Sequence, residues 1–103
     1  MSKYHAKPTT IDGHRFASQA EGRRYVALKK MAKDQEITDL DLQPKFPIEV
    51  NEHKICTYIA DFDYTDKDGA YIVEDVKGFK TSIYRLKKKL VEAIYGIEIT
   101  EVK

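Results

Sequence analysis

The sequence is poor in the residues that mark fibrous, disordered or disulfide-rich proteins. Its 103 residues include five glycines, three prolines and one cysteine, without an internal repeat or a low-complexity tract. With 42% hydrophobic and 34% charged residues, the composition is typical of an ordinary globular protein. The single cysteine, Cys56, cannot form an internal disulfide, and we interpret it as a small apolar residue in a strand. This use of cysteine indicates a reducing compartment.

Long hydrophobic runs are also missing. No segment approaches the roughly 18 to 20 apolar residues that cross a bilayer, and the start, "MSKYHAKPTT", lacks the apolar segment of a signal peptide. We therefore expect a cytoplasmic protein without a membrane partner.

Neither sign of charge is in excess, because 18 Lys and Arg side chains face 17 Asp and Glu side chains. The net charge of +1 hides a local asymmetry, since the acids concentrate in residues 34–75 and the bases in two predicted helices. The total therefore excludes no class of partner. The length fits one domain over residues 1–103.

The hydrophobic pattern predicts a mixed sheet flanked by two helices, in the order helix, three strands, helix, strand. The expected helices and strands cover residues 18–33 (helix), 46–50, 55–64 and 71–77 (strands), 81–96 (helix) and 97–102 (strand). Asp and Gly in "TDKDGA" predict a hairpin turn before the third strand. Residues 1–15 are predicted to be a flexible arm or a loop, and residues 34–46 a turn-rich connection.

Each predicted helix carries an apolar stripe at helical spacing. The stripe of the first helix comprises Ala20, Tyr25, Leu28, Met31 and Ala32, and includes one acid, Glu21. The stripe of the second helix comprises Ile83, Leu86, Leu90 and Ile94, and Gly96 stands where a helix commonly ends.

Acids occur where two neighbouring strands would be expected to carry apolar side chains. Because side chains alternate along a strand, Asp61 and Asp63 share one face, and Asp75 and Lys77 share one face. In an antiparallel hairpin, Asp61 and Asp75 come together only if the numbers of opposed residues sum to an even number. A slip by one residue would instead place Glu74 beside Asp61, and the sequence leaves both registers open.

With the even register, these residues predict a magnesium site. Two carboxylates about 4 Å apart repel by roughly 4 kcal/mol at an effective dielectric of 20, and a divalent cation relieves this repulsion. Lys77 lies two residues from Asp75, so its ammonium could reach a phosphate or an attacking water. This chemistry would hydrolyse a phosphodiester. The alternative is a solvated strand edge with weak ion pairs.

The segments "FASQAEGRRY", "LQPKF", "YIADFDY" and "YIVEDVKG", followed by a basic helix, resemble the PD-(D/E)XK nuclease superfamily, and more closely its small phage-encoded members. The resemblance runs from about Tyr4 to Val102 and implies a restriction-endonuclease-like core. It implies Mg²⁺-dependent hydrolysis of DNA, with Mn²⁺ as a possible substitute, by a structure-selective or recombination-associated endonuclease similar to Holliday-junction resolvases. A phage enzyme of this kind would act in the cytoplasm of the host cell.

The resemblance assigns catalytic roles to four residues: Glu21, Asp61, Asp75 and Lys77. Asp61 and Asp75 would bind the metal, and Glu21 would bind it directly or through water. Two positions depart from the pattern, because Ala60 precedes Asp61 where proline is usual and Ala17 replaces an expected acid. Glu21 also has two structural interpretations, a capping box with Ser18 and an ion pair with Arg24.

The basic second helix suggests contact with nucleic acid. We expect Lys80, Tyr84 and Lys87 to approach DNA phosphates, although such a charge run is also typical of a solvated face. Gln43 is a further candidate, with a hydrogen bond at the start of a strand as its alternative role. The small domain offers little surface to a duplex, so we expect a homodimer. The competing function is a non-catalytic nucleic-acid-binding or phage assembly module, and cleavage of RNA or of a flap stays open.

Overall fold

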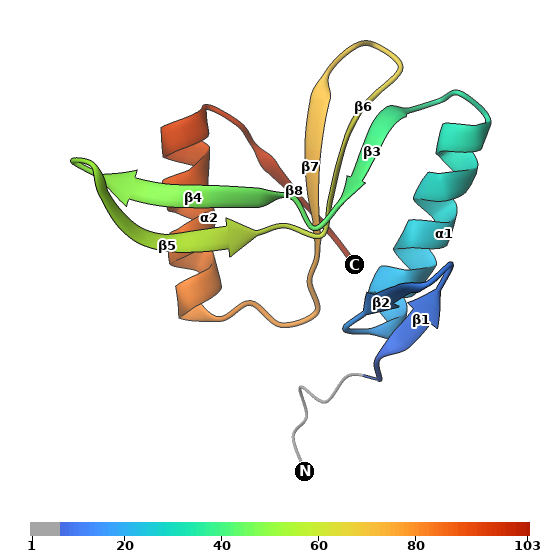
Figure 1. Cartoon of the computed structure of the whole chain (residues 1–103), viewed down its shortest axis with the longest axis horizontal. Helices are drawn as coiled ribbons and strands as arrows, with labels where there is room; N and C mark the ends of the chain where they lie inside the picture. The colour runs from blue at the N-terminus through green and yellow to red at the C-terminus, as the bar shows by residue number, and fades with distance from the viewer. Residues whose placement is uncertain (1–6) are drawn as a thin grey trace.

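The computed structural model describes residues 7–103 and shows two helices on opposite sides of a central sheet (Figure 1). The sheet has the strand order β3-β6-β7-β8, with bounds Thr38–Leu42, Phe62–Thr65, Tyr71–Val76 and Ile99–Val102. Its first three strands are antiparallel, whereas β8 runs parallel to β7. The prediction of an α/β protein with a mixed sheet and two flanking helices is confirmed.

The first strands form a hairpin that the sequence interpretation had assigned to an arm or loop. β1 (Thr9–Ile11) pairs with β2 (His14–Phe16) across Asp12 and Gly13, both of which have positive φ angles of 53° and 78°. An Asp-Gly pair suits the tight turn that joins twisted strands. The prediction for residues 1–15 is therefore wrong at Thr9–Ile11 and His14–Arg15, which are strand, and its part at residues 1–6 lies outside the described residues.

Two further boundaries differ from the prediction. Residues 34–46 contain β3 rather than only a connection, and residues 55–64 are two strands, β5 (His53–Ile59) and β6. β4 (Lys45–Val50) pairs with β5 across a turn at residues 51–52.

The two pairs β3–β6 and β4–β5 are halves of one bent antiparallel ribbon. At the bend, the N–H of Gln43 donates to the carbonyl of Asp61 at 2.9 Å, and the N–H of Ala60 donates to the carbonyl of Pro44 at 3.1 Å. Gln43 has a φ of 54°, in the left-handed region that non-glycine residues rarely adopt. The bend therefore places Asp61 at the point where the chain leaves one sheet and enters the other.

Helix α1 (Gln19–Lys33) covers one face of the central sheet. Ser18 caps it, accepting a hydrogen bond from the N–H of Glu21 at 3.2 Å. Tyr25 and Leu28 are buried, as their predicted stripe requires, in a cluster with Phe62 and Tyr64 of β6.

Helix α2 (Ser82–Tyr95) lies on the other side, where it contacts β4 and β5. Thr81 caps its start, and Gly96 ends it with a φ of 66°. Its buried residues are Tyr84 and Val91, which join Val73 and Ile99 in a second core cluster. The stripe found in the sequence thus faces outward over much of its length, because the helix packs through a different side.

No helix within residues 7–103 is long and apolar enough to cross a membrane.

Candidate active site

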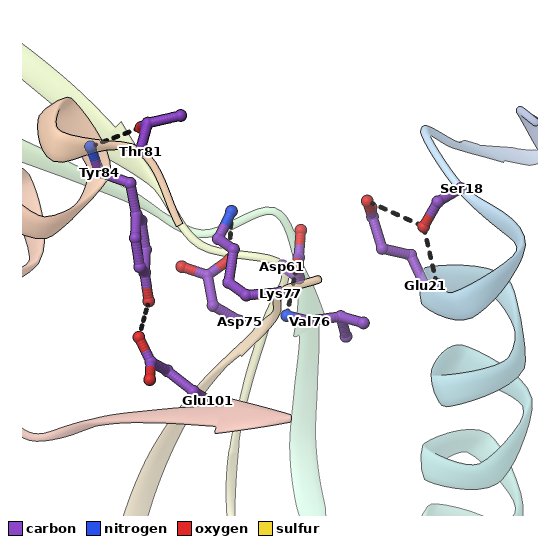
Figure 2. Close-up of polar contacts among 9 residues, drawn as sticks. All are labelled: Ser18, Glu21, Asp61, Asp75, Val76, Lys77, Thr81, Tyr84 and Glu101. Carbon is purple, nitrogen blue, oxygen red and sulfur yellow. Dashed lines mark hydrogen bonds and ion pairs between the residues drawn. The ribbon is translucent and has the colours of Figure 1, made fainter. Parts of the chain in front are cut away.

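The hairpin register places the main candidate residues on one face of the sheet. Phe62 lies opposite Glu74, so opposed residue numbers sum to an even number, the register that was required to bring Asp61 and Asp75 together. Asp61 directly precedes this paired segment, and its N–H donates to the carbonyl of Glu74 at 3.1 Å. Figure 2 shows Asp61, Asp75 and Lys77 between the first turns of α1 and α2.

Asp75 is the most unusual residue of this group. Its side chain is fully buried, and neither carboxylate oxygen has a hydrogen-bond partner. Burial raises its pKa to about 6, although the charge of Lys77 acts in the opposite direction. Since a buried ionised carboxylate is costly without a partner, Asp75 has the properties of a ligand for a cation.

Lys77 is held beside this carboxylate. Its Nζ lies 3.5 Å from Oδ1 of Asp75 and 4.7 Å from the ring centre of Tyr84. The carboxylate and the negative face of the aromatic ring both attract the ammonium. The amine is therefore restrained while its side chain keeps 28% of its surface exposed, enough to meet a substrate.

Asp61 is fixed by the neighbouring strand. Its Oδ2 accepts a hydrogen bond of 2.7 Å from the backbone N–H of Val76, and the carboxyl group of Glu21 interacts with it from α1 (Figure 2). Burial raises the pKa of Asp61, while this hydrogen bond and the charge of Lys77 oppose the increase.

Glu21 approaches the group from the first turn of α1. Its carboxylate accepts a hydrogen bond of 3.4 Å from the hydroxyl of Ser18, and Figure 2 shows it directed toward Asp61. Burial and then the charge of Asp61 raise the pKa of Glu21 to about 7. The alternative ion pair with Arg24 is absent among the contacts shown for residues 7–103, because that guanidinium binds Glu74.

The donor set fits Mg²⁺, which prefers carboxylate oxygens and usually takes one or two of them, with water in its other positions. Asp75, whose oxygens make no hydrogen bond and a single ion pair with Lys77, and Asp61, which has one oxygen bound to a backbone N–H, supply two such ligands. Within residues 7–103, no three His, Cys, Asp or Glu side chains lie close enough to hold a metal ion together. Glu21 therefore stands beside this pair rather than within one three-carboxylate group.

Asp63 belongs to a different group. It lies opposite Asp41 of β3, and its Oδ2 accepts a hydrogen bond of 2.5 Å from the hydroxyl of Tyr71. Burial raises its pKa, and the charge of Asp41 acts in the same direction.

The four predicted DNA contacts occupy different environments. Tyr84 is only 8% exposed, and its hydroxyl donates to Glu101 at 2.7 Å. The prediction that Tyr84 contacts a DNA phosphate is therefore wrong; its ring packs against the ammonium of Lys77 instead. Lys80 forms an ion pair of 3.0 Å with the same Glu101. Lys87 lies partly buried on α2, and Gln43 is exposed at the bend next to Asp61.

One buried network escaped the sequence interpretation. Arg24 donates two hydrogen bonds, of 2.8 and 2.6 Å, to the carboxylate of Glu74, which also accepts from the hydroxyl of Tyr64. Strand alternation had indicated that Glu74 points away from Asp75, toward the other face. That face is covered by α1, so Glu74 needed a basic partner on this helix. The sequence signal for this partner was Arg24, a basic residue within the predicted first helix.

The fold and the site define a small α/β protein with a buried carboxylate, a second acid and a lysine at one end of a mixed sheet. The chain belongs to the family described as "Protein of unknown function (DUF1064)", whose model matches residues 1–102. No curated protein matches the chain, and no solved structure does.

Proposed function

We propose that this protein is a Mg²⁺-dependent endonuclease that hydrolyses phosphodiester bonds in DNA. The observation that carries the proposal is the fully buried carboxylate of Asp75, with both oxygens free of hydrogen bonds and Lys77 3.5 Å away. A structural ion pair would normally satisfy more of the lone pairs of a buried acid. A ligand that supplies positive charge would satisfy them.

The mixed sheet between two helices is consistent with the restriction-endonuclease-like core that the sequence resemblance implies. In such a core, the strand bearing Asp61 and the strand bearing Asp75 and Lys77 are neighbours, as β6 and β7 are. The chain would then act as a structure-selective or recombination-associated enzyme, with Mn²⁺ able to replace Mg²⁺.

In the proposed reaction, Asp61 and Asp75 would hold the metal ion, and Glu21 would bind it directly or through a water. The ion would lower the pKa of a bound water and neutralise charge on the phosphate oxygens. Lys77, restrained by Asp75 and the ring of Tyr84, aligns the attacking water with phosphorus and stabilises the added negative charge. The water loses a proton to solvent and its oxygen bonds to phosphorus as the bond to the leaving oxygen breaks, and the leaving oxygen takes up a proton from solvent.

The arrangement of the helices supports an anionic substrate. Figure 2 shows the site between the first turns of both helices, and the N-terminal end of a helix carries partial positive charge. Lys80 and Lys87 add charge at the α2 side. DNA contact through these two lysines and Gln43 is part of the proposal.

A cleavage assay tests the proposed function. Purified protein with Mg²⁺ or Mn²⁺ is incubated with plasmid and with four-way junction, flap and RNA substrates, to find which polymer and shape it cuts. Asp75→Asn and Lys77→Ala should abolish cleavage. Asp68→Asn and Lys67→Ala, in the exposed turn between β6 and β7, are matched controls that should cleave normally.

DNA binding without cleavage in either metal would contradict the proposal and favour the non-catalytic nucleic-acid-binding or phage assembly module. Cleavage that survives Asp75→Asn would place the active site elsewhere.

A further inference from the structure

Helix α2 exposes a continuous apolar stripe. We call Ile83, Leu86, Leu90 and Ile94 the α2 stripe; their spacing of three and four residues places them on one side of the helix. Ile83, Leu86 and Ile94 are 63%, 57% and 46% exposed, and Leu90 is partly buried. An amphipathic helix normally buries such a stripe, but α2 packs against the molecule mainly through Tyr84 and Val91, and of the stripe Leu90 alone packs against that core cluster.

The exposed surface continues onto the neighbouring strand. Ile59 of β5 is 51% exposed and lines, with Ile83, a hollow of ≈ 310 Å³ between β5 and the start of α2. Four apolar side chains that are 46% to 63% exposed, with the partly buried Leu90 among them, form a patch of roughly several hundred Å², a size that marks interaction surfaces. A standard protein–protein interface buries about 800 Å² of surface on each partner. This patch is smaller, so it would form the apolar centre of such an interface.

We propose that the α2 stripe is the interface of a homodimer, in which α2 of one copy packs antiparallel against α2 of a second copy. The stripe has gaps of three, four and four residues, so it is almost the same in either direction. A two-fold axis near its middle places Leu86 opposite Leu90, and Ile83 opposite Ile94. This self-complementarity is what a two-fold interface requires, because each copy presents the same patch to the other.

The charges beside the stripe determine how the dimer responds to salt. Lys87 flanks the stripe on one side, and Arg85 and Lys89 lie beyond its other side. The two-fold axis brings like charges of the two copies closer, so their repulsion opposes the apolar attraction. Added salt screens this repulsion, and the dimer is therefore tighter at high salt than at low salt.

The dimer would also set the separation of the two candidate active sites, a consequence that rests on the proposed function. Each site adjoins the start of α2 (Figure 2). Fourteen residues of helix span about 21 Å. Antiparallel helices therefore place the two sites at opposite ends of the interface, about 20 Å or more apart, as two cuts in different strands require.

Sedimentation equilibrium in the absence of metal and DNA tests the interface. The wild-type chain should be a dimer at about 100 µM, and Leu86→Glu and Ile83→Glu should each be monomeric with an unchanged circular dichroism spectrum. Val26→Glu, at a 52% exposed apolar position on α1, is the matched control and should stay dimeric. A monomeric wild type, or a dimer that tolerates both stripe substitutions, would overturn the proposal.

Disulfide cross-linking tests the orientation. In a Cys56→Ala background, Leu86→Cys and Leu90→Cys chains mixed in equal amounts should cross-link with each other more rapidly than either chain alone with itself. A disulfide needs Cα atoms about 4.4 to 6.8 Å apart, a condition that the antiparallel arrangement meets best for the mixed pair. Cross-linking of each variant only with itself would indicate a parallel packing and overturn the antiparallel interface.

Both experiments omit DNA and metal, so they distinguish the two proposals. A dimer without nuclease activity would reject the proposed function alone, and an active monomer would reject the interface alone.

Discussion

At the scale of single residues, Asp75 has an unfavourable environment in the metal-free protein. Its carboxylate is removed from water, and its oxygens lack hydrogen bonds. The single ammonium of Lys77, 3.5 Å away, compensates only part of the cost of desolvation. The pKa of Asp75 therefore stays raised, at about 6. Function explains such a residue better than stability does, since an amide or apolar side chain would fit the same space at lower cost.

Asp75→Asn should therefore stabilise the metal-free protein at neutral pH. The pKa of Asp75 rises from 3.8 to about 6 on folding, so the native state binds its proton more tightly than the unfolded state does. The resulting stability is complete below pH 3.8 and is lost as the pH rises through about 6. At pH 7.5 the substitution should raise the free energy of unfolding by up to about 3 kcal/mol.

Urea denaturation of both proteins at pH 7.5 and pH 3.5 measures this difference. The gain should nearly disappear at the lower pH, where Asp75 is neutral in the native state and mostly neutral in the unfolded state. Mg²⁺ should stabilise the wild type and leave Asp75→Asn unchanged. A variant less stable than the wild type at pH 7.5 would show that Asp75 has a structural partner.

Arg24 has a positioning role because its bidentate pair with Glu74 fastens α1 to β7, three residues after Glu21 on the helix. Arg24→Ala leaves Glu74, which is 1% exposed, buried without its cation, and should cost about 3 to 5 kcal/mol of unfolding free energy. Arg23→Ala, at the exposed neighbouring position, should change stability by less than about 0.5 kcal/mol. Equal effects in thermal denaturation would contradict this role.

At the scale of helices and strands, the sequence predicted those elements whose signals are local. Both helices carry cap residues, and Thr81 and Gly96 mark the ends of α2 as expected. The hairpin β6–β7 follows from Asp and Gly in its turn. The even register of Phe62 and Glu74 was one of two possibilities, and only the structure selects it.

The errors have tertiary causes. β3 contains Asp39 and Asp41, which resemble turn residues, and it is a strand because β6 pairs with it. Residues 55–64 form an uninterrupted β-rich run, yet the ribbon bends at Asp61, where long-range hydrogen bonds replace a local signal. The outward orientation of the α2 stripe likewise depends on where β4 and β5 lie, which helical periodicity cannot specify.

Gly22 shows how the N-terminal hairpin is attached to α1. A Cβ added at this position would lie 2.7 Å from Thr9 Cγ2 and 3.0 Å from Ile11 Cδ1, so these side chains, or the strand β1 that carries them, would have to shift. Gly22→Ala should therefore cost about 1 to 2 kcal/mol, although alanine normally favours a helix by about 1 kcal/mol over glycine.

Chemical denaturation measures the effect of Gly22→Ala, and hydrogen exchange of the β1–β2 amides should show weaker protection. Gly78→Ala meets no atom within 4 Å and serves as the control. A stabilised Gly22→Ala protein would contradict the close approach of β1.

At the scale of the whole molecule, the chain is flat, with extents of 43 × 42 × 21 Å, because its two helices lie on either side of the sheet. The candidate site lies between the starts of these helices, and the basic residues of α2 extend from it. A polyanion bound there would release counterions from each contacting lysine.

Lys87→Ala should reduce the slope of the logarithm of DNA affinity against the logarithm of salt concentration by about 1. Lys67→Ala, in the exposed β6–β7 turn, should leave the slope unchanged. Fluorescence anisotropy with a labelled duplex in Ca²⁺, over a series of salt concentrations, measures both. An identical slope for the wild type and Lys87→Ala would exclude Lys87 from the DNA interface.

An anomalous diffraction map of crystals soaked in Mn²⁺ would locate a metal ion at the candidate site. Binding by Asp75 and Asp61 should give a strong peak within bonding distance of their carboxylate oxygens, and no such peak in Asp75→Asn crystals. A fully soaked wild-type crystal without a peak at Asp75, while Lys77 keeps its ion pair with that carboxylate, would contradict the metal site and the nuclease mechanism built on it.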